Sequence, residues 1–289
     1  MNLLKSIYVS TYMMLAAVIT VFAAYRLIDT GNVMSWGGVL LVYAPFMAVL
    51  ARIMALRNTP RTSARFPILI TLGVVGVLTS AWGYLDGDSV TALLLAAGGL
   101  VAFLIYDYWY SSFGGRDHSG LVAGQPLPDF ELKNPAGDIV SSAALMNKPT
   151  VWIFYRGNWC PLCMAQVKEI AAQYNELEAL GVRVALVSPQ PHKFSIGLAK
   201  KFDVNFDFLT DEGNRAAKQL GIAQSYGVPM GMQVLGYDSD TVMPTVIITD
   251  NNGRVLWSDE TDNYRVRPDP DTYLRVIRTQ SDVGRRTSA

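Results

Sequence analysis

The chain has 289 residues, of which 51% are hydrophobic, with 24 basic and 24 acidic side chains and a mean hydropathy of +0.22. The balanced charge excludes the strongly basic surface of a typical nucleic-acid-binding protein. Only two cysteines are present, both in one short motif, which excludes a secreted scaffold stapled by disulfides. The hydropathy is high for a soluble protein, and the excess lies in residues 1–110.

Residues 1–110 contain four uncharged stretches, each close to the roughly 20 residues that cross a bilayer core as a helix. Tryptophan and tyrosine cluster at their ends, as expected of side chains at a membrane interface. Four such runs in succession argue against buried core helices of a soluble protein. The sequence therefore predicts an α-helical transmembrane domain of four helices: Ser6–Tyr25, Thr30–Ala51, Phe66–Leu85 and Ser89–Tyr106.

The loops between these stretches predict the orientation of the protein. Positive charge stays on the cytoplasmic side of a membrane. The loop between the second and third stretches has four arginines and no acid, and the next loop has two aspartates and no base; Lys5 places the N-terminus with the arginines. Four crossings return the chain to the cytoplasm. We therefore expect a multi-pass protein of a bacterial inner membrane with its C-terminal domain in the cytoplasm.

A glycine-rich linker, 111–123, leads to a domain at 124–280 in which strand and helix patterns alternate, and 281–289 reads as a disordered tail. Residues 250–253, Asp-Asn-Asn-Gly, predict a tight turn between the last two strands. This order predicts an α/β domain, a mixed sheet with helices on both faces. The expected strands are 129–132, 151–155, 182–187, 206–209, 245–249 and 255–257, and the expected helices are 161–180, 192–202, 214–220 and 270–279.

Both cysteines lie in Trp159-Cys160-Pro161-Leu162-Cys163, directly after the apolar run 151–155 and at the start of a helical pattern. Two sulfurs with this spacing on the first turn of a helix can close a small disulfide ring, and the helix N-terminus favours a thiolate. Zinc needs four ligands, and His118 and His192 are not at ligand spacing, so we expect no metal. A structural disulfide would constrain little of the chain. The motif therefore indicates a redox-active dithiol.

Four motifs in this domain resemble the peroxiredoxin-like (AhpC/TSA, redoxin) family of the thioredoxin fold. They are Phe-Tyr-Arg-Gly-Asn-Trp-Cys-Pro-Leu-Cys at 154–163, Gly-Gln-Pro-Leu-Pro-Asp-Phe at 124–130, Met-Pro-Thr at 243–245 and Tyr-Arg-Val-Arg-Pro at 264–268. The resemblance covers about residues 120–280 and none of the membrane part. It implies a thioredoxin-like fold in which a cis proline, Pro244, follows Met243 and faces the dithiol.

The resemblance leaves two roles open for the cysteines. In the thioredoxin pattern, Cys160 attacks a protein disulfide and Cys163 releases it. In the peroxiredoxin pattern, the second position, Cys163, attacks the peroxide, and its sulfenate can be captured by Cys160. The sequence departs from typical peroxiredoxins because Cys160 replaces the threonine that helps to hold peroxide.

The arginine that activates the thiolate is also not fixed by the pattern. An arginine beside the sulfur lowers its pKa and orients the peroxide. Arg254 lies close to the expected strand position, and the alternative donors are Arg156, Arg265 and Arg267. Trp159 beside the first cysteine, and Pro161 after it, complete the expected site.

These features predict a membrane-anchored thiol oxidoreductase that acts on a small peroxide or a protein disulfide and receives electrons from an unknown thiol donor. A peroxiredoxin-like peroxidase with antioxidant activity is favoured. A thioredoxin-like disulfide reductase and a redox-sensing membrane partner protein are the alternatives. Membrane lipid is an expected partner, and no cofactor and no nucleic acid are expected.

Overall fold

Four long apolar helices form the N-terminal part of the chain in the computed structural model, which describes residues 1–116, 120–202 and 204–287, so that His118 lies outside it. All four are long and apolar enough to cross a membrane, as the sequence predicts. The last of them continues into a short π-helix, η1. Their bounds are α1 Asn2–Thr30, α2 Val33–Leu56, α3 Pro67–Leu85, α4 Val90–Leu104 and η1 Ile105–Tyr110.

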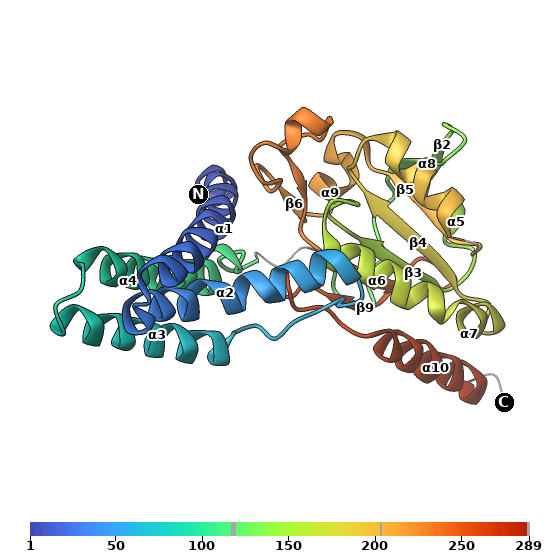
Figure 1. Cartoon of the computed structure of the whole chain (residues 1–289). Coiled ribbons are helices and arrows are strands. Elements are labelled where there is room, and N and C mark those ends of the chain that lie inside the picture. Colours follow the sequence, from blue (N-terminus) through green and yellow to red (C-terminus); the bar gives the residue numbers. More distant parts are fainter. Residues whose placement is uncertain (117–119, 203, 288–289) are drawn as a thin grey trace.

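Helices α2 and α3 approach closely because glycines face each other across their contact. A Cβ on Gly38 would lie 2.5 Å from the carbonyl oxygen of Gly76, and a Cβ on Gly76 would lie 2.5 Å from that of Gly38. Only glycine fits this backbone separation, which is typical of helix pairs in membranes. The four helices gather at one end of the molecule, and the C-terminal end of α2 reaches toward the second part of the chain (Figure 1).

A seven-stranded mixed sheet forms the core of the C-terminal part, in the order β2-β1-β5-β4-β3-β8-β9. Strand β3 pairs in parallel with β4 and antiparallel with β8. The strands are β1 Glu131–Lys133, β2 Ile139–Ser141, β3 Thr150–Phe154, β4 Arg183–Ser188, β5 Asp207–Thr210, β8 Thr245–Thr249 and β9 Val255–Asp259, with a separate pair, β6 Ala223–Gln224 and β7 Thr241–Val242.

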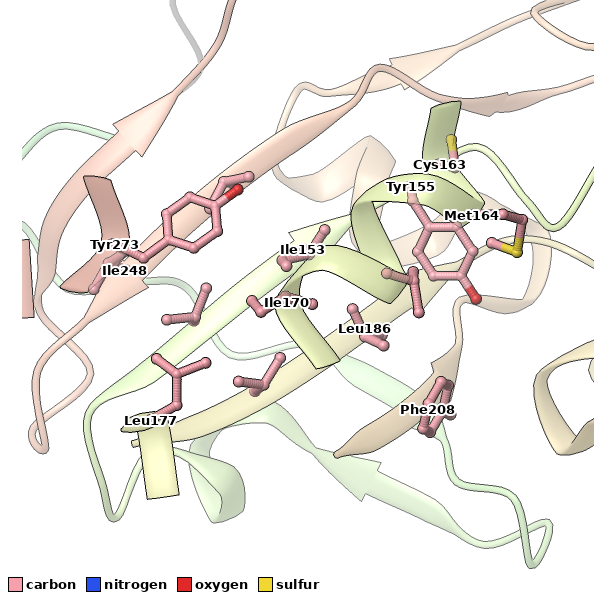
Figure 2. Packing of buried hydrophobic residues seen from close by; sticks show 14 of the residues in the cluster. Ile153, Tyr155, Cys163, Met164, Ile170, Leu177, Leu186, Phe208, Ile248 and Tyr273 are labelled. Atoms are coloured by element: carbon pink, nitrogen blue, oxygen red, sulfur yellow. The ribbon is translucent and has the colours of Figure 1, made fainter. Parts of the chain in front are cut away.

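Side chains of β3 alternate between two apolar layers, because successive residues of a strand point to opposite faces. Val151 and Ile153 pack against α6, α8 and α10, as Figure 2 shows in part, whereas Trp152 and Phe154 pack against α9. Helices thus cover both faces, as predicted. They are α5 Ser142–Leu145, α6 Pro161–Ala172, α7 Tyr174–Ala179, α8 His192–Lys201, α9 Arg215–Gln219 and α10 Pro270–Thr287, with short 3-10 turns η2 Glu212–Asn214 and η3 Met232–Leu235.

Several element bounds differ from those expected. The helix expected over 161–180 breaks at Gln173, whose backbone leaves the helical conformation at φ −100° and ψ 14°. Short elements such as β6 and β7 were not predicted, because two-residue strands depend on their pairing partner rather than on a local pattern. Helix α10 runs to Thr287, so residues 281–287 of the expected disordered tail continue a helix that no proline interrupts.

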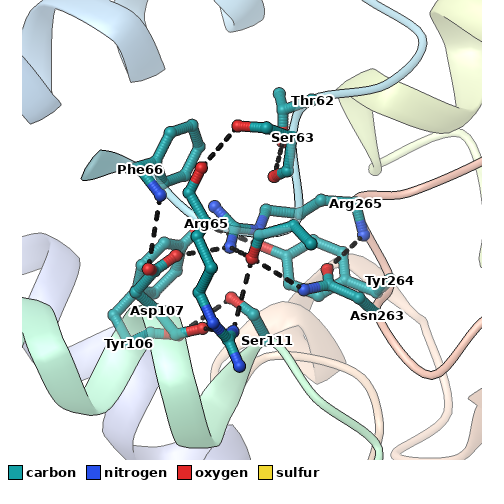
Figure 3. A network of polar contacts seen from close by, with 11 residues as sticks. Thr62, Ser63, Arg65, Phe66, Tyr106, Asp107, Ser111, Asn263, Tyr264 and Arg265 are labelled. Carbon is teal, nitrogen blue, oxygen red and sulfur yellow. Dashed lines mark hydrogen bonds and ion pairs between the residues drawn. The ribbon is translucent and has the colours of Figure 1, made fainter. Parts of the chain in front are cut away.

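A buried ion pair joins the two parts of the chain. Arg265 Nη2 lies 2.6 Å from Asp107 Oδ1, and the two side chains are 2% and 0% exposed. The same guanidinium donates to the carbonyl oxygen of Ala64 at 3.0 Å and lies over the ring of Phe66. The hydroxyls of Tyr106 and Tyr264 are 2.7 Å apart in the same network (Figure 3). A buried charge is tolerated only when it is paired, so these contacts fix how the sheet domain sits on the helices.

The starts of α1 and α3 and the ends of α2 and α4 lie on one side of the helices, and all four meet the sheet domain there. Ser6, at the start of α1, donates to the carbonyl oxygen of Val228 at 2.6 Å. Arg61, after α2, forms an ion pair with Glu169 of α6. Asp107, after α4, holds Arg265 as described. The arginine-rich loop and the sheet domain therefore lie on one side of the helices.

We predict that Arg265→Met destabilises the folded protein by about 3–5 kcal/mol, because it leaves Asp107 buried without its partner. The measurement is urea unfolding of the protein in detergent micelles, followed by tryptophan fluorescence. The double variant Arg265→Met, Asp107→Leu should recover most of the loss. Arg26→Met, which removes an exposed ion pair with Asp29, is the control and should change stability by about 0–1 kcal/mol; equal losses in both single variants would contradict the prediction.

Candidate active site

The two cysteines lie at the start of α6, just beyond the carboxyl end of the central strand β3. Cys160 precedes the helix and Pro161 is its first residue, a position where the missing N–H of proline leaves no bond unmade. Cys163 follows on the first turn. Both thiols are free, and Cys160 is 3% and Cys163 0% exposed. The sequence-predicted dithiol is therefore assembled on one helix turn, below the surface.

The loop between β3 and α6 is held in a conformation that requires glycine. Gly157 has φ +145°, and a Cβ there would lie 2.7 Å from Nε1 of Trp159. The next residue, Asn158, donates its backbone N–H to Gln190 Oε1 at 2.8 Å and accepts a bond from the Tyr237 hydroxyl. These contacts fix the chain that presents Cys160.

One guanidinium reaches both sulfurs. Arg267 Nη2 lies 3.3 Å from Cys163 Sγ and 3.9 Å from Cys160 Sγ. Its Nη1 donates to Gln166 Oε1 at 2.6 Å, and Gln166 Nε2 donates to the Tyr273 hydroxyl at 3.2 Å. Arg267 is 4% exposed, so its charge acts on the sulfurs with little screening by water.

The surroundings of the two thiols shift their pKa values in opposite directions. Burial opposes ionisation of Cys163, but a hydrogen bond from Cys160 and the charge of Arg267 hold its pKa well below the ordinary value. The bond to Cys163, burial and the charge of that sulfur raise the pKa of Cys160 well above its ordinary value. Burial alone would lower the pKa of Arg267, yet the sulfurs raise it. The site therefore favours one thiolate, on Cys163, with a neutral thiol beside it.

Arg156 and Trp159 lie together on the side of Cys160. The Arg156 guanidinium sits 5.0 Å from the ring centre of Trp159 and 5.4 Å from that of Tyr264. It donates to the carbonyl oxygen of Gly227. Nε of Arg156 and Nε1 of Trp159 are buried and have no hydrogen-bond partner among the described residues. The side chains of these two sequence-predicted residues shape the surroundings of Cys160, while the backbone of Arg156 forms a hydrogen bond with Cys163 that helps to lower its pKa.

The expected cis proline is wrong, because the Met243–Pro244 bond is trans. Pro244 directly precedes β8, whose register pairs Thr245 with Phe154, and the start of a strand is a position that accepts a trans proline. The backbone N–H of Met243 donates to the carbonyl oxygen of Ile222 at 2.8 Å. The backbone before the proline is thus already paired within the chain.

The four candidate arginines have different partners. Arg254 is on the exposed hairpin and donates to the carbonyl oxygen of Gly124. The side chain of Arg265 pairs with Asp107 and that of Arg156 with the carbonyl oxygen of Gly227. Of the four guanidinium groups, only that of Arg267 bonds to a sulfur. The sequence placed Arg267 among the alternatives but could not select it, and it gave no sign of Gln166. Gln166 lies three residues after Cys163, on the same face of the helix. This spacing is the only local sign in the sequence that Gln166 belongs to the site.

Known proteins that are similar to this chain match its C-terminal domain. Residues 123–258 match the AhpC/TSA family. A putative peroxiredoxin bcp of Helicobacter pylori is 32% identical over 110 residues, which cover 37% of this chain and 72% of that protein. This chain belongs to the AhpC/TSA family. Its four N-terminal helices lie outside the matched segment.

Other relatives are plant proteins. A chloroplastic peroxiredoxin Q of Populus jackii is 32% identical over 127 residues, and the match covers 43% of this chain and 58% of the relative. The chain thus spans little more than half the length of that relative. The crystal structure of peroxidoxin BcpB from Mycobacterium tuberculosis superposes with a TM-score of 0.46 at 20% identity, covering 54% of this chain and 96% of that one.

We predict that Arg267→Gln raises the pKa of the Cys163 thiol by about one to three pH units, because a charge this close favours the thiolate by that amount. In a Cys160→Ser background, the ultraviolet absorbance of the single thiolate is followed against pH. The absorbance should be lost on acidification, and in Arg267→Gln that loss should begin at a higher pH. Arg267→Lys should restore part of the effect and Arg254→Gln should have none. An unchanged titration in Arg267→Gln would contradict this assignment.

Proposed function

We propose that this chain is a membrane-anchored thiol peroxidase in which Cys163 attacks the peroxide and Cys160 resolves the product. The contact between Arg267 Nη2 and Cys163 Sγ carries this proposal, because it favours the thiolate at the second cysteine. A thiolate is the nucleophile that peroxide reduction needs. Membership of the AhpC/TSA family supports the same assignment.

The two sulfurs become thiolates one after the other, and this order sets the steps of the reaction. The Cys163 thiolate attacks one peroxide oxygen, the O–O bond breaks, and the other oxygen takes a proton from solvent and leaves as water or an alcohol. Cys163 is then a neutral sulfenic acid, so the negative charge that raised the pKa of Cys160 is gone while Arg267 remains nearby. Cys160 loses its proton and attacks the Cys163 sulfur. An S–S bond forms, the S–O bond breaks, and water leaves.

A protein-disulfide reductase is less well supported. That activity needs a thiolate on Cys160 that a protein substrate, much larger than a peroxide, can reach, but Cys160 is 3% exposed and its pKa is raised. The backbone N–H of Met243, which would pair with a substrate peptide, is already bonded to Ile222. We therefore do not propose this activity.

We also propose that the four helices cross a membrane and that the sheet domain faces the cytoplasm. The length and composition of α1 to α4 support the crossing. The loop with Arg57, Arg61 and Arg65 meets the sheet domain, whereas Asp86 and Asp88 lie at the opposite end of the helices. Positive charge remains in the cytoplasm, so the sheet domain belongs on that side.

In stopped-flow mixing of the reduced protein with hydrogen peroxide, we predict a fast change in tryptophan fluorescence that requires Cys163. Cys163→Ser should abolish it, because this change removes the sulfur that attacks the peroxide. Cys160→Ser should keep the first phase but form no internal disulfide, and a second peroxide should then oxidise Cys163 further. A fast phase that survives Cys163→Ser and is lost in Cys160→Ser would reverse the two roles.

For the orientation, we predict that alkaline phosphatase fused after Ala289 is inactive in cells, because this reporter acts only in the periplasm. The same reporter inserted at Gly87, in the loop that carries Asp86 and Asp88, should be active. The protein should also stay with the membrane pellet after alkaline washing. Activity of the fusion after Ala289 would overturn the cytoplasmic assignment.

A further inference from the structure

An apolar cavity of about 170 Å³ separates the dithiol from the membrane helices. One wall is built by residues of α2, among them Phe46, Val49, Leu50 and Ile53. The opposite wall contains Cys160 and Trp159, and Cys163 is not among the lining residues. A ligand in this cavity therefore lies against Cys160, on the side of the N-terminal helices.

Three residues that line the cavity also have buried hydrogen-bond donors without a partner in the part of the chain that the structure describes. Arg156 and Arg265 line it and are 4% and 2% exposed. Nε of each, Nη1 of Arg265 and Nε1 of Trp159 are buried with no partner among the described residues. A buried donor without a partner destabilises a protein. These groups suit a ligand whose oxygen atoms accept hydrogen bonds. Because Asp107 already pairs with Arg265, Arg156 is the cation that suits a ligand that becomes negatively charged.

The size of the cavity limits the ligand. An engineered apolar cavity of about 150 Å³ in another protein holds one benzene ring. A folded donor protein cannot reach Cys160 in this arrangement, since α2 and the loop that carries Pro229 cover it. The ligand therefore combines a small aromatic ring system with acceptor oxygens, and several apolar residues of the cavity wall belong to helices of membrane-spanning length. A lipid-soluble quinone has all of these properties.

We propose that this cavity binds a membrane quinol, which reduces the Cys160–Cys163 disulfide and so supplies the electrons for peroxide reduction. This inference rests on the proposed peroxidase function. The S–S bond and both O–H bonds of the quinol break, and two electrons pass to the sulfurs. Cys160 becomes a thiol, Cys163 leaves as a thiolate, the second proton goes to solvent, and a quinone remains.

Arg267 favours this direction of electron flow. Stabilising the thiolate of one cysteine stabilises the reduced form of the pair, which makes the disulfide a stronger oxidant. A stabilised thiolate is also the better leaving group. Cys163, held by Arg267 on the far side of the cavity, has both properties, while Cys160 faces the ligand. The peroxide step then removes the electrons and makes the whole cycle favourable.

The test uses the full chain in detergent micelles, with hydrogen peroxide and a benzoquinol or naphthoquinol that carries one isoprenoid unit. Quinone formation is followed by absorbance, and dithiothreitol-supported turnover of peroxide is the reference. We expect quinol-supported turnover that Leu50→Trp, which fills the cavity, lowers by at least about tenfold relative to the reference, a loss of about 1.4 kcal/mol. Leu94→Trp, at an exposed position of α4, is the matched control and should leave the ratio unchanged.

The outcomes separate the two proposals. Turnover with dithiothreitol but with neither quinol overturns the quinol inference and leaves the peroxidase. Absence of turnover with every reductant overturns both. Equal quinol turnover in Leu50→Trp and Leu94→Trp overturns the cavity as the site. Equilibrium dialysis of the oxidised quinone with the wild-type chain needs no variant to fold: saturable binding of one quinone per chain is expected, and its absence overturns the site.

Discussion

The buried pair between Arg265 and Asp107 is the contact on which the arrangement of the molecule depends. Each side chain carries a full charge in a place that water does not reach, and neither is tolerable there alone. The pair brings the end of α4 and η1 against the loop before α10. Since Ala64 and Phe66 contact the same guanidinium, the start of α3 is held by it too. Three chain segments therefore converge on one charge.

The same loop also reaches the active site. Arg265 and Arg267 are two residues apart, and they point to different partners: the first to the four N-terminal helices, the second to the dithiol. Tyr264 beside them bonds to Tyr106 and lies near Arg156. The position of the activating guanidinium is thus fixed by the same short segment that seats the helices. In this fold, the same short segment contacts both the four N-terminal helices and the sulfurs.

The chemistry of the site comes from an unequal pair of thiols. Both cysteines are buried, which by itself would keep them protonated. Arg267 lies closer to Cys163 than to Cys160, and the thiol of Cys160 donates to the Cys163 sulfur. The negative charge is therefore favoured on Cys163. Loss of that charge, as in a sulfenic acid, frees the other thiol to ionise. Arg267 can in this way stabilise first the thiolate of Cys163 and then that of Cys160.

Local patterns are enough to predict the four apolar helices, the mixed sheet and the place of the two cysteines at a helix start. They depend on uncharged runs of about bilayer length, on strand and helix periods, and on cysteines that directly precede a helical pattern. Only the tertiary structure selected Arg267 over Arg156, Arg254 and Arg265, since the four are separated along the chain and their distance to a sulfur is set by packing. It also made the Met243–Pro244 bond trans, and it paired Arg265 with Asp107, residues 158 positions apart. Such contacts leave no local pattern, because they arise only when distant segments pack together.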